Sequence, residues 1–382
     1  MDLIVFLALT LCITCCNVEA RNKTLINGET NVTLFGSPMM QRQVKNDFIC
    51  VDIYKQPTLQ HPSLKNHKVQ LYPTFAKNDM QRRPSFGKTM DVCSPGKVPI
   101  YNKTPIITNS SSRLQTDHFK QYSKNSHGYH TVTLDTTQNM IFRGASAGIG
   151  GYNLSLQANQ FSLSSIWLES GPSVELNSIK AGIGVHPNLY GDSQVRLTGQ
   201  WTADGFKKTG CYNILCSGFV QVNRDKEYAL GTVLHPAGSI GSIKKSIGLI
   251  KIKQDQSTGH WWLIIQKELI YTGYWPRELF THLQKGASLI KFGGQTYAPP
   301  NKDSPPMGSG RLPKENFKNS GFMGLLEIID SEYNEHDIKP ENMKIYTNSK
   351  SECYDLKYHG YEGPFYRQSF LYGGPGGQNC DI

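Results

Sequence analysis

The sequence predicts an all-β protein of the sandwich or barrel type. Short runs rich in β-branched and aromatic residues recur after about residue 128, and Gly, Pro, Asn and Asp separate them. With 382 residues, 38% of them hydrophobic and 18% charged, the chain has an ordinary globular composition. No repeat of solenoid or propeller length is visible. These observations favour a sheet-based core.

The N-terminus predicts export. Leu3 to Cys16 form an apolar run of secretory length, and small residues at Val18 and Ala20 fit a cleavage site. The run is too short to span a bilayer, which needs about 20 residues. We therefore expect residues 1–20 to be a signal peptide, the protein to be secreted and no membrane anchor to remain. A buried N-terminal helix is the alternative.

Charge separates the rest of the chain into two parts. Residues 21–127 hold 16 Lys and Arg against 6 Asp and Glu, whereas residues 128–382 hold 24 against 22. Because the larger part is nearly neutral, nucleic-acid binding is not expected. The chain turns polar and Ser-rich between about Asn102 and His127. We expect a segment over 21–127, ending in an exposed linker, and a main domain over 128–382.

Strands are expected in order along the chain. In the N-terminal segment, Phe48–Ile53 predicts a short strand, and His61–His67 predicts a turn or a single helical turn. The pattern from Pro276 to Gly286 predicts one helix, with Pro at its start and Gly as its terminator. The strands expected in the main domain are Tyr129–Leu134, Phe161–Leu168, Gly218–Val222, Ile247–Ile252, His260–Gln266 and Leu325–Ile329.

Six cysteines remain after the signal peptide, which removes Cys12, Cys15 and Cys16. An even number suits three disulfides in an oxidising compartment, and six cysteines allow 15 connectivities. The segment boundary isolates Cys50 with Cys93 and leaves four cysteines for the larger domain, where we expect the pairs Cys211–Cys216 and Cys353–Cys380. Zinc is the competing reading, but Cys211 and Cys216 have no matching ligand pair at finger spacing. No metal or cofactor is expected.

Five Asn-x-Ser/Thr sequons predict glycosylation, and four of them lie before residue 128. The asparagines are Asn22, Asn31, Asn102, Asn109 and Asn153.

Other motifs carry less chemistry. Gly144-Ala-Ser-Ala-Gly148 has the spacing of a nucleophile elbow, but the residues that follow it are poor helix formers. We therefore do not expect Ser146 to be a nucleophile. His127 and His130 lack a further clustered ligand and are expected in the linker and at a strand edge. The tryptophans and the tail tyrosines are expected in the core rather than in a groove. They are Trp201, Trp261, Trp262, Trp275, Tyr366 and Tyr372.

Several stretches taken together resemble the neprosin family of plant secreted proteins, whose active members are glutamic peptidases that cleave next to proline. Cys50-Val-Asp-Ile-Tyr-Lys-Gln-Pro57 and His61-Pro-Ser-Leu-Lys-Asn-His-Lys68 resemble the family's activation peptide. Stretches of the main domain follow in family order: Asn177–Gly182, Leu189–Asp192, Gly210–Asn213, Cys216–Val220, Gly259–Trp262, Gly273–Pro276, Met307–Gly310 and Tyr372–Pro375. The resemblance implies a removable pro-segment and a catalytic domain built as an antiparallel β-sandwich.

The family's two catalytic glutamates lie in Ser-Ile-Glu-Ala-Gly-Trp and Gly-Gly-Glu stretches. Here the matching stretches read Ser178-Ile-Lys180-Ala-Gly-Ile183 and Gly293-Gly-Gln295, so both glutamates are replaced. A peptidase of this kind needs a carboxylate to take a proton from water and a partner to stabilise the oxyanion. Gln295 can donate to an oxyanion but cannot act as a base. Lys180, with an ordinary pKa of about 10.4, is protonated at acidic pH unless burial lowers that pKa.

The resemblance and the substitutions together predict a secreted protein with a glutamic-peptidase fold and little or no peptidase activity. Its expected ligand is a peptide or protein, which could be proline-rich or part of the cell wall. Its expected location is the apoplast or cell wall. The alternative is an active proline-directed endopeptidase that uses Lys180 as a neutral base or a relocated carboxylate such as Glu169 or Glu175. A purely structural wall protein is a weaker option because repeats are absent.

The pro-segment adds a pH expectation. Its four histidines, His61, His67, His118 and His127, gain charge below about pH 6.5 in a segment that is already basic. We expect acid to increase repulsion within the segment and to promote its removal.

Overall fold

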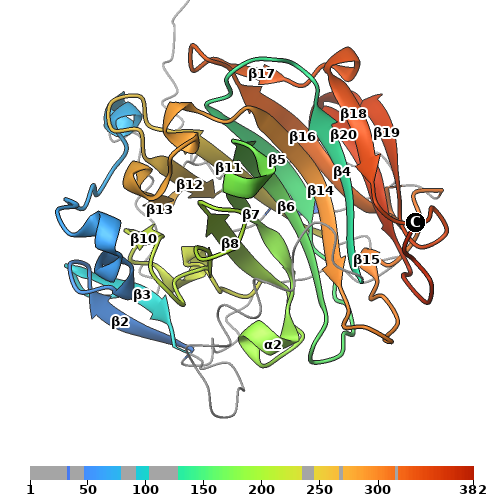
Figure 1. Cartoon of the computed structure of the whole chain (residues 1–382), viewed down its shortest axis with the longest axis horizontal. Helices are drawn as coiled ribbons and strands as arrows, with labels where there is room; N and C mark the ends of the chain where they lie inside the picture. Colours follow the sequence, from blue (N-terminus) through green and yellow to red (C-terminus); the bar gives the residue numbers. More distant parts are fainter. Residues whose placement is uncertain are drawn as a thin grey trace, which may run out of the picture.

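The fold is all-β, as predicted. We describe a computed structural model of the chain, which places residues 32–34, 47–78, 92–102, 128–234, 245–265, 270–314 and 317–382. Two large sheets, antiparallel except for the parallel pairing of Val32–Leu34 with Lys245–Ile247, pack face to face, and a small two-stranded sheet lies at one end (Figure 1). None of the helices in these ranges is long and apolar enough to cross a membrane. The expected signal peptide lies outside the described residues.

One large sheet contains eleven of the described strands. Its path runs β10 (Val220–Gln221), β13 (Ile270–Trp275), β12 (Trp261–Ile265), β11 (Lys245–Gln254), β5 (Gly144–Gly150), β16 (Gly321–Ile329), β20 (Gln368–Gly374) and β15 (Met307–Gly308). Off this path, β1 (Val32–Leu34) pairs with β11, β17 (Glu335–Asp337) with β16, and β19 (Asp355–Tyr361) with β20.

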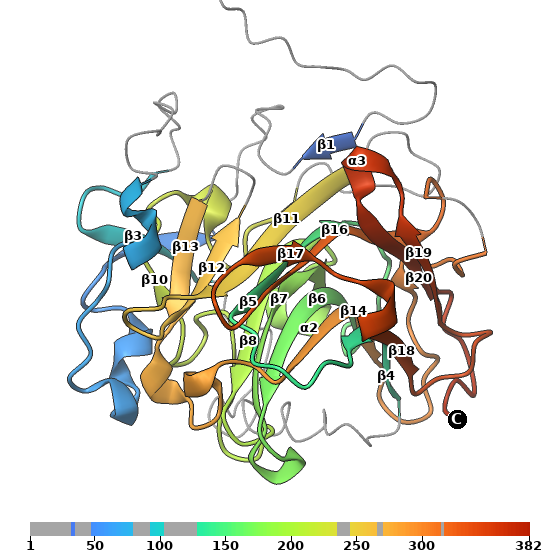
Figure 2. The ribbon, with the colours of Figure 1, turned by 90° about the horizontal axis from the view of Figure 1, so that it is seen from above.

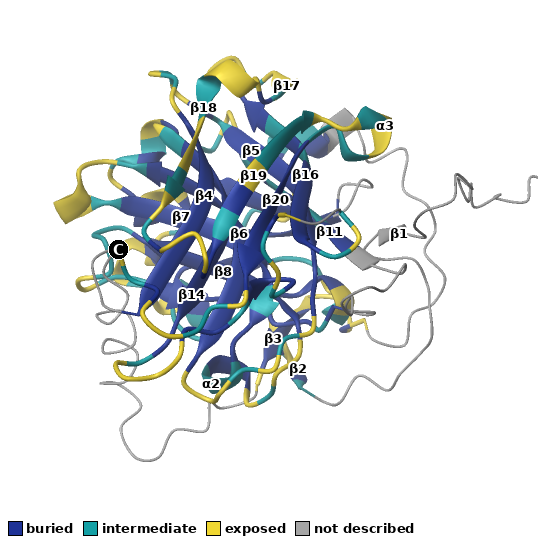
Figure 3. Ribbon diagram, turned by 90° about the vertical axis from the view of Figure 1, so that its right-hand side faces the viewer, coloured by how far each residue is buried: buried dark blue, intermediate teal, exposed yellow. Residues whose placement is uncertain are grey.

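The second large sheet contains seven of the described strands. Its order is β18 (Met343–Thr347), β4 (Tyr129–Thr136), β14 (Leu289–Tyr297), β6 (Phe161–Ser170), β7 (Asn177–Val185), β8 (Arg196–Thr202) and β9 (Cys211–Tyr212). Its central strands β4, β6, β7, β8 and β14 are buried along nearly their whole length (Figure 3). This sheet positions the candidate site.

The core lies between the two sheets. Ala145 and Ile149 of β5 share one apolar cluster with Ile166 of β6, Ile179 of β7 and Phe292 of β14. Along each strand of the seven-stranded sheet, every second residue faces this core, because successive side chains of a strand point to opposite faces. Of the four tryptophans that we expected in the core, Trp201, Trp261 and Trp275 are buried there with Tyr372. Trp262 is buried in a separate cluster on the other side of the eleven-stranded sheet, and Tyr366 is only half-buried.

The N-terminal segment forms its own small unit beside β10 and β13 (Figures 1 and 2). β2 (Phe48–Asp52) pairs antiparallel with β3 (Lys97–Tyr101). Between them lie three short 3₁₀ turns, at Pro57–Gln60, Pro62–Leu64 and Thr74–Asn78. The second of these is the single helical turn allowed for by the sequence.

The expected strands are present, but the expected helix is not. Between Pro276 and Gly286 the chain makes two separate 3₁₀ turns, Arg277–Leu279 and Leu283–Lys285. The backbone N–H groups of Thr281, His282 and Leu283 all donate to Oδ1 of Asn177, at 2.8, 2.8 and 3.2 Å. A distant side chain thus takes the donors that a helix would use within itself, and the prediction of one helix was wrong.

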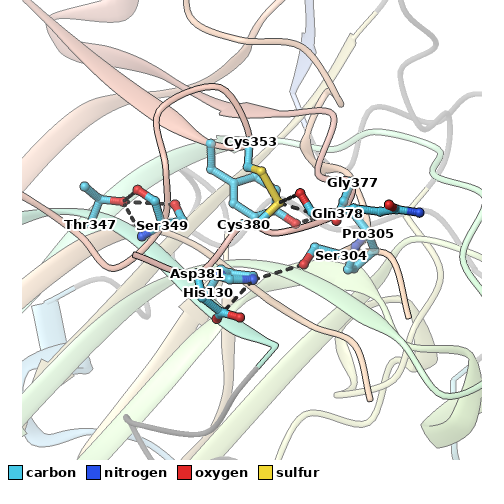
Figure 4. The surroundings of a disulfide bond; sticks show 11 residues. His130, Ser304, Pro305, Thr347, Ser349, Cys353, Gly377, Gln378, Cys380 and Asp381 are labelled. Carbon is cyan, nitrogen blue, oxygen red and sulfur yellow. Dashed lines mark hydrogen bonds and ion pairs between the residues drawn. A yellow bond between two sulfur atoms is a disulfide. The ribbon is translucent and has the colours of Figure 1, made fainter. Parts of the chain in front are cut away.

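The three disulfides among the described residues are the expected pairs, Cys50–Cys93, Cys211–Cys216 and Cys353–Cys380. The Cys50–Cys93 bond links β2 to the residues just before β3, within the N-terminal unit. The third ties the C-terminal tail to the loop before β19, next to buried His130 (Figure 4). Because Cys211 and Cys216 are bonded to each other, they are not zinc ligands.

Candidate functional site

The two positions that the resemblance assigns to the family dyad meet in the structure. Lys180 on β7 and Gln295 on β14 lie on the two strands that flank β6. Nζ of Lys180 donates a hydrogen bond to Oε1 of Gln295 at 3.0 Å. Both side chains are buried, with exposed fractions of 8% and 2%. Two residues far apart in sequence therefore form one polar contact, at the place where the resemblance puts the dyad.

Small residues open the path between them. Gly293, Ser165 and Gly182 lie side by side across β14, β6 and β7, in the row between Lys180 and Gln295. A Cβ at Gly182 would come within 1.9 Å of the Ser164 carbonyl oxygen, and one at Gly293 within 2.2 Å of the Val132 carbonyl oxygen. Because two of the three residues in this row are glycines and the third is a serine, Lys180 can extend over it to Gln295.

Oε1 of the Gln295 side chain accepts a second hydrogen bond, from the Tyr129 hydroxyl at 2.7 Å. Burial raises the pKa of Tyr129 far above its ordinary value, so this phenol stays protonated. Two donors thus converge on the oxygen of an amide, which is a poor proton acceptor. The contact fixes the Gln295 side chain and supplies no general base.

Lys180 also lies over an aromatic ring. Its Nζ is 4.2 Å from the ring centre of Trp167 and 5.8 Å from that of Phe206. Trp167 faces Lys180 directly across the β6–β7 pair, so the contact follows from strand register. Ring faces attract cations, which makes this a favourable place for an ammonium group.

Further charged groups share the face. Lys291 of β14 lies opposite Trp167 and forms an ion pair with Glu169, Nζ to Oε2 at 2.8 Å. Both members of the pair are buried. Asp135 of β4, also buried, lies opposite Lys291 on the other side. The register therefore gathers two lysines and two carboxylates on the face that points away from the core, which we call the polar face.

Several buried polar atoms on the polar face have no hydrogen-bond partner. They are Oγ1 of Thr133, Oγ of Ser178, Oε1 of Gln200 and Nε1 of Trp167. Gln200 and Trp167 are direct cross-strand neighbours of Lys180, Ser178 lies two residues away on β7, and Thr133 lies on β4 opposite Gly293. Buried polar groups are normally paired, and leaving one unpaired costs about 1–3 kcal/mol. Such a cluster is typical of a surface that receives a ligand or ordered water.

The other candidate residues lie elsewhere or are already engaged. Glu175 is exposed and its carboxylate is 3.3 Å from Nε2 of His282. Ser146 lies within strand β5, not on an elbow, and donates to Glu327 at 2.7 Å. His130, near the start of β4, is buried and lies 3.0 Å from the Ser304 hydroxyl (Figure 4). None of these three residues is near Lys180 in register.

Two of the five sequons fall on described residues, and both asparagines, Asn102 and Asn153, are exposed. Asn22, Asn31 and Asn109 lie outside the described residues, as do His118 and His127.

A family model described as Neprosin matches residues 158–375, which is more than half of the chain. The chain belongs to the neprosin family. Both dyad positions lie inside the matched region. Among solved structures, two of scytalido-glutamic peptidase are similar to this neprosin-family chain. One, with a transition state analog inhibitor, has 8% identity, covers 64% of this chain and 98% of that chain, and has a TM-score of 0.34. The other, with a peptide-based transition state analog, has 6% identity, coverages of 65% and 98%, and a TM-score of 0.33.

The resemblance singled out Lys180 and Gln295, which the structure brings into contact, but sequence reasoning missed the rest of the polar face. A signal was present in β4, where Thr131, Thr133 and Asp135 alternate with Val132 and Leu134. Such alternation marks a strand with one polar face. The sequence could not show that this face is buried, and burial makes its polar atoms informative.

Proposed function

We propose that this neprosin-family protein is secreted, has little or no peptidase activity and binds a peptide, a proline-rich protein or cell-wall material over the polar face. The observation that carries the proposal is the Lys180–Gln295 contact. Its supports are the substitution of both dyad glutamates and the unpartnered polar atoms around the contact.

The chemistry of the site argues against efficient hydrolysis. Attack of water on a peptide bond needs a group that accepts a proton as the bond forms. Lys180 is a donor to Gln295, and the Gln295 oxygen already accepts two hydrogen bonds. Glu169 is engaged by Lys291. Loss of a general base lowers the reaction rate by about 10²–10⁴-fold. The turnover rate should therefore be a small fraction of that of an active family member.

The same site remains suited to binding. Hydroxyls at Thr133 and Ser178, the carbonyl of Gln200 and the indole N–H of Trp167 offer both donors and acceptors. A peptide backbone or a hydroxyl-rich polymer can satisfy both kinds of group. An occupant that pairs these atoms recovers the free energy that their burial costs, and this gain would favour binding without turnover.

The test compares four proteins in cleavage of a proline-containing fluorogenic peptide at acidic pH. They are the wild type, the Lys180→Glu/Gln295→Glu variant, a matched Lys180→Gln variant and a Lys180→Ala variant. We expect the double-glutamate variant to cleave at least about 10²-fold faster than the wild type, because it restores a carboxylate base. Lys180→Gln removes the lysine without adding a carboxylate and should not gain activity.

Two outcomes would overturn the proposal. Efficient cleavage by the wild type that Lys180→Ala abolishes would make Lys180 a catalytic residue. Wild-type cleavage that survives Lys180→Ala but is lost in Glu169→Gln would point to a relocated carboxylate. Either result would favour the alternative function, an active proline-directed endopeptidase matured by acid-promoted removal of the segment before residue 128.

A further inference from the structure

We infer that the N-terminal unit is a lasting part of the folded protein: after any cut in residues 103–127, it stays docked at neutral pH on the β10–β13–β12 end of the eleven-stranded sheet. We call described residues 47–78 and 92–102 the N-terminal module. The inference goes beyond the proposed function, since it concerns the lasting partner of this sheet end and does not depend on what the polar face binds.

The module completes the edge of the sheet at β10. The Gln56 side chain accepts from the Gln221 backbone N–H at 2.9 Å and donates to the Gln221 carbonyl at 3.2 Å. The Thr58 hydroxyl donates to the Phe219 carbonyl. All of these groups are buried. An edge strand normally leaves such backbone groups open, and here side chains of the module pair them.

A buried carboxylate clamps the module further along. Asp255, fully buried, accepts from the Thr74 backbone N–H at 2.6 Å, from the Thr74 hydroxyl at 2.7 Å and from the Gln70 amide at 3.0 Å. Burial alone would raise the pKa of Asp255, but these donors outweigh it and lower that pKa. Removal of the module would take all three donors from this carboxylate.

The module also covers an apolar surface of the sheet. Val220, Trp262, Ile264 and Tyr274 form a buried cluster, against which Leu59, Val69 and Phe75 of the module pack. Other module side chains, Ile53, Leu64, Val98 and Ile100, belong to the main core itself. Release of the module would expose these apolar side chains to water, which is unfavourable.

No disulfide among the described residues joins the module to the rest of the protein. Cys50–Cys93 is internal to the module, and the other two bonds are internal to the remainder. Persistence after a cut must therefore come from the docking contacts alone. This makes the inference measurable, because a weak contact would let the fragments separate.

The experiment introduces a recognition site for a sequence-specific protease between residues 103 and 127 of the full chain. The purified protein is cut at pH 7.5, and its fragments are followed by gel filtration with mass spectrometry. We expect the two fragments to co-elute at equal stoichiometry. In Asp255→Ala, we expect the fragments to dissociate at least about 10-fold more readily, because the clamp is lost.

Thr58→Val serves as a second variant with a small change on the module side, and Ser146→Ala serves as a control on the far strand β5. We expect Thr58→Val to weaken co-elution and Ser146→Ala to leave it unchanged. Separation of the wild-type fragments at pH 7.5 would overturn the inference. Co-elution of the Asp255→Ala and Thr58→Val fragments as tight as in the wild type would overturn the contacts assigned to docking. Neither readout involves cleavage of a substrate, so failure here and failure of the proposed function are distinguishable.

Discussion

Two polar regions on the outer faces of the two large sheets, one around Ser146 and one around Lys180, have polar atoms that are satisfied to different degrees. On the eleven-stranded sheet, Ser146 donates to Glu327, and Arg367 bridges Glu327 and Asp337 at 2.6 and 2.7 Å. On the seven-stranded sheet, hydroxyl, amide and indole atoms around Lys180 are buried without partners. A satisfied network is sufficient for stability, whereas an unsatisfied one suggests an occupant. The region around Lys180 is therefore the one to test for function.

The largest effect is expected from the buried ion pair of the polar face. Lys291→Met leaves the buried Glu169 carboxylate without its 2.8 Å partner. We expect the free energy of unfolding to fall by about 3–5 kcal/mol, as when one partner of a buried pair is removed. Urea denaturation measures it. The double variant Lys291→Met/Glu169→Leu should recover most of the loss. A loss below about 1 kcal/mol in the single variant would show that solvent reaches this pair.

The next effect concerns pH and the N-terminal module. His260 packs against His67 of the module, and burial lowers the pKa of His260 to about 4. Its other charged or titratable neighbours are Glu278, Asp255, Arg277 and Tyr274. Although burial raises the pKa of Glu278, the hydrogen bond from His67 and the nearby histidines lower it on balance.

The lowered pKa values of His260 and Glu278 both make the folded protein less stable as the pH falls. In the unfolded chain His260 is protonated below about pH 6.5, whereas in the folded protein it is protonated only below about pH 4. The free energy of unfolding therefore falls as the pH is lowered over that range. We expect the wild type to lose about 3 kcal/mol more than His260→Gln between pH 7 and pH 4. Glu278 adds to the loss as it titrates. Urea denaturation of both proteins at pH 7 and pH 4 measures these losses. Equal losses in the two proteins would exclude this contact as a source of acid sensitivity.

The smallest effect separates the two faces most cleanly. Ser146→Ala removes a hydrogen bond to Glu327, and we expect it to destabilise the protein by about 1 kcal/mol. Ser178→Ala removes a buried hydroxyl that has no partner, so we expect it to be neutral or slightly stabilising. Thermal unfolding of the two variants side by side gives the comparison. Equal destabilisation by both substitutions would mean that the polar face is as well satisfied as the region around Ser146.

The sequence predicted the fold well where local pattern decides it. Strand runs, the single turn at Pro62–Leu64 and all three cysteine pairs were found from spacing and composition. It failed at 276–286, where periodicity predicted a helix. There, three backbone donors bond to Asn177, about 100 residues earlier in the chain. No local pattern can report a competitor that arrives from another strand.

The candidate site was predicted only in part for a related reason. Family positions led to Lys180 and Gln295, which the structure brings to 3.0 Å. Tyr129, Trp167 and Lys291 complete their surroundings through register across four strands. Register follows from pairing partners, and the sequence alone did not give the strand order.

The most direct test of the central claim is peptide binding at the polar face. A fluorescent proline-containing peptide is titrated into the linker-cut protein, and anisotropy is compared between the wild type, the Thr133→Val/Ser178→Ala variant and the Ser146→Ala control. We predict saturable binding without cleavage in the wild type and the control, and at least about 10-fold weaker binding in the double variant, because two hydrogen bonds are lost. Equal affinity in all three proteins, or cleavage of the peptide by the wild type, would contradict the account.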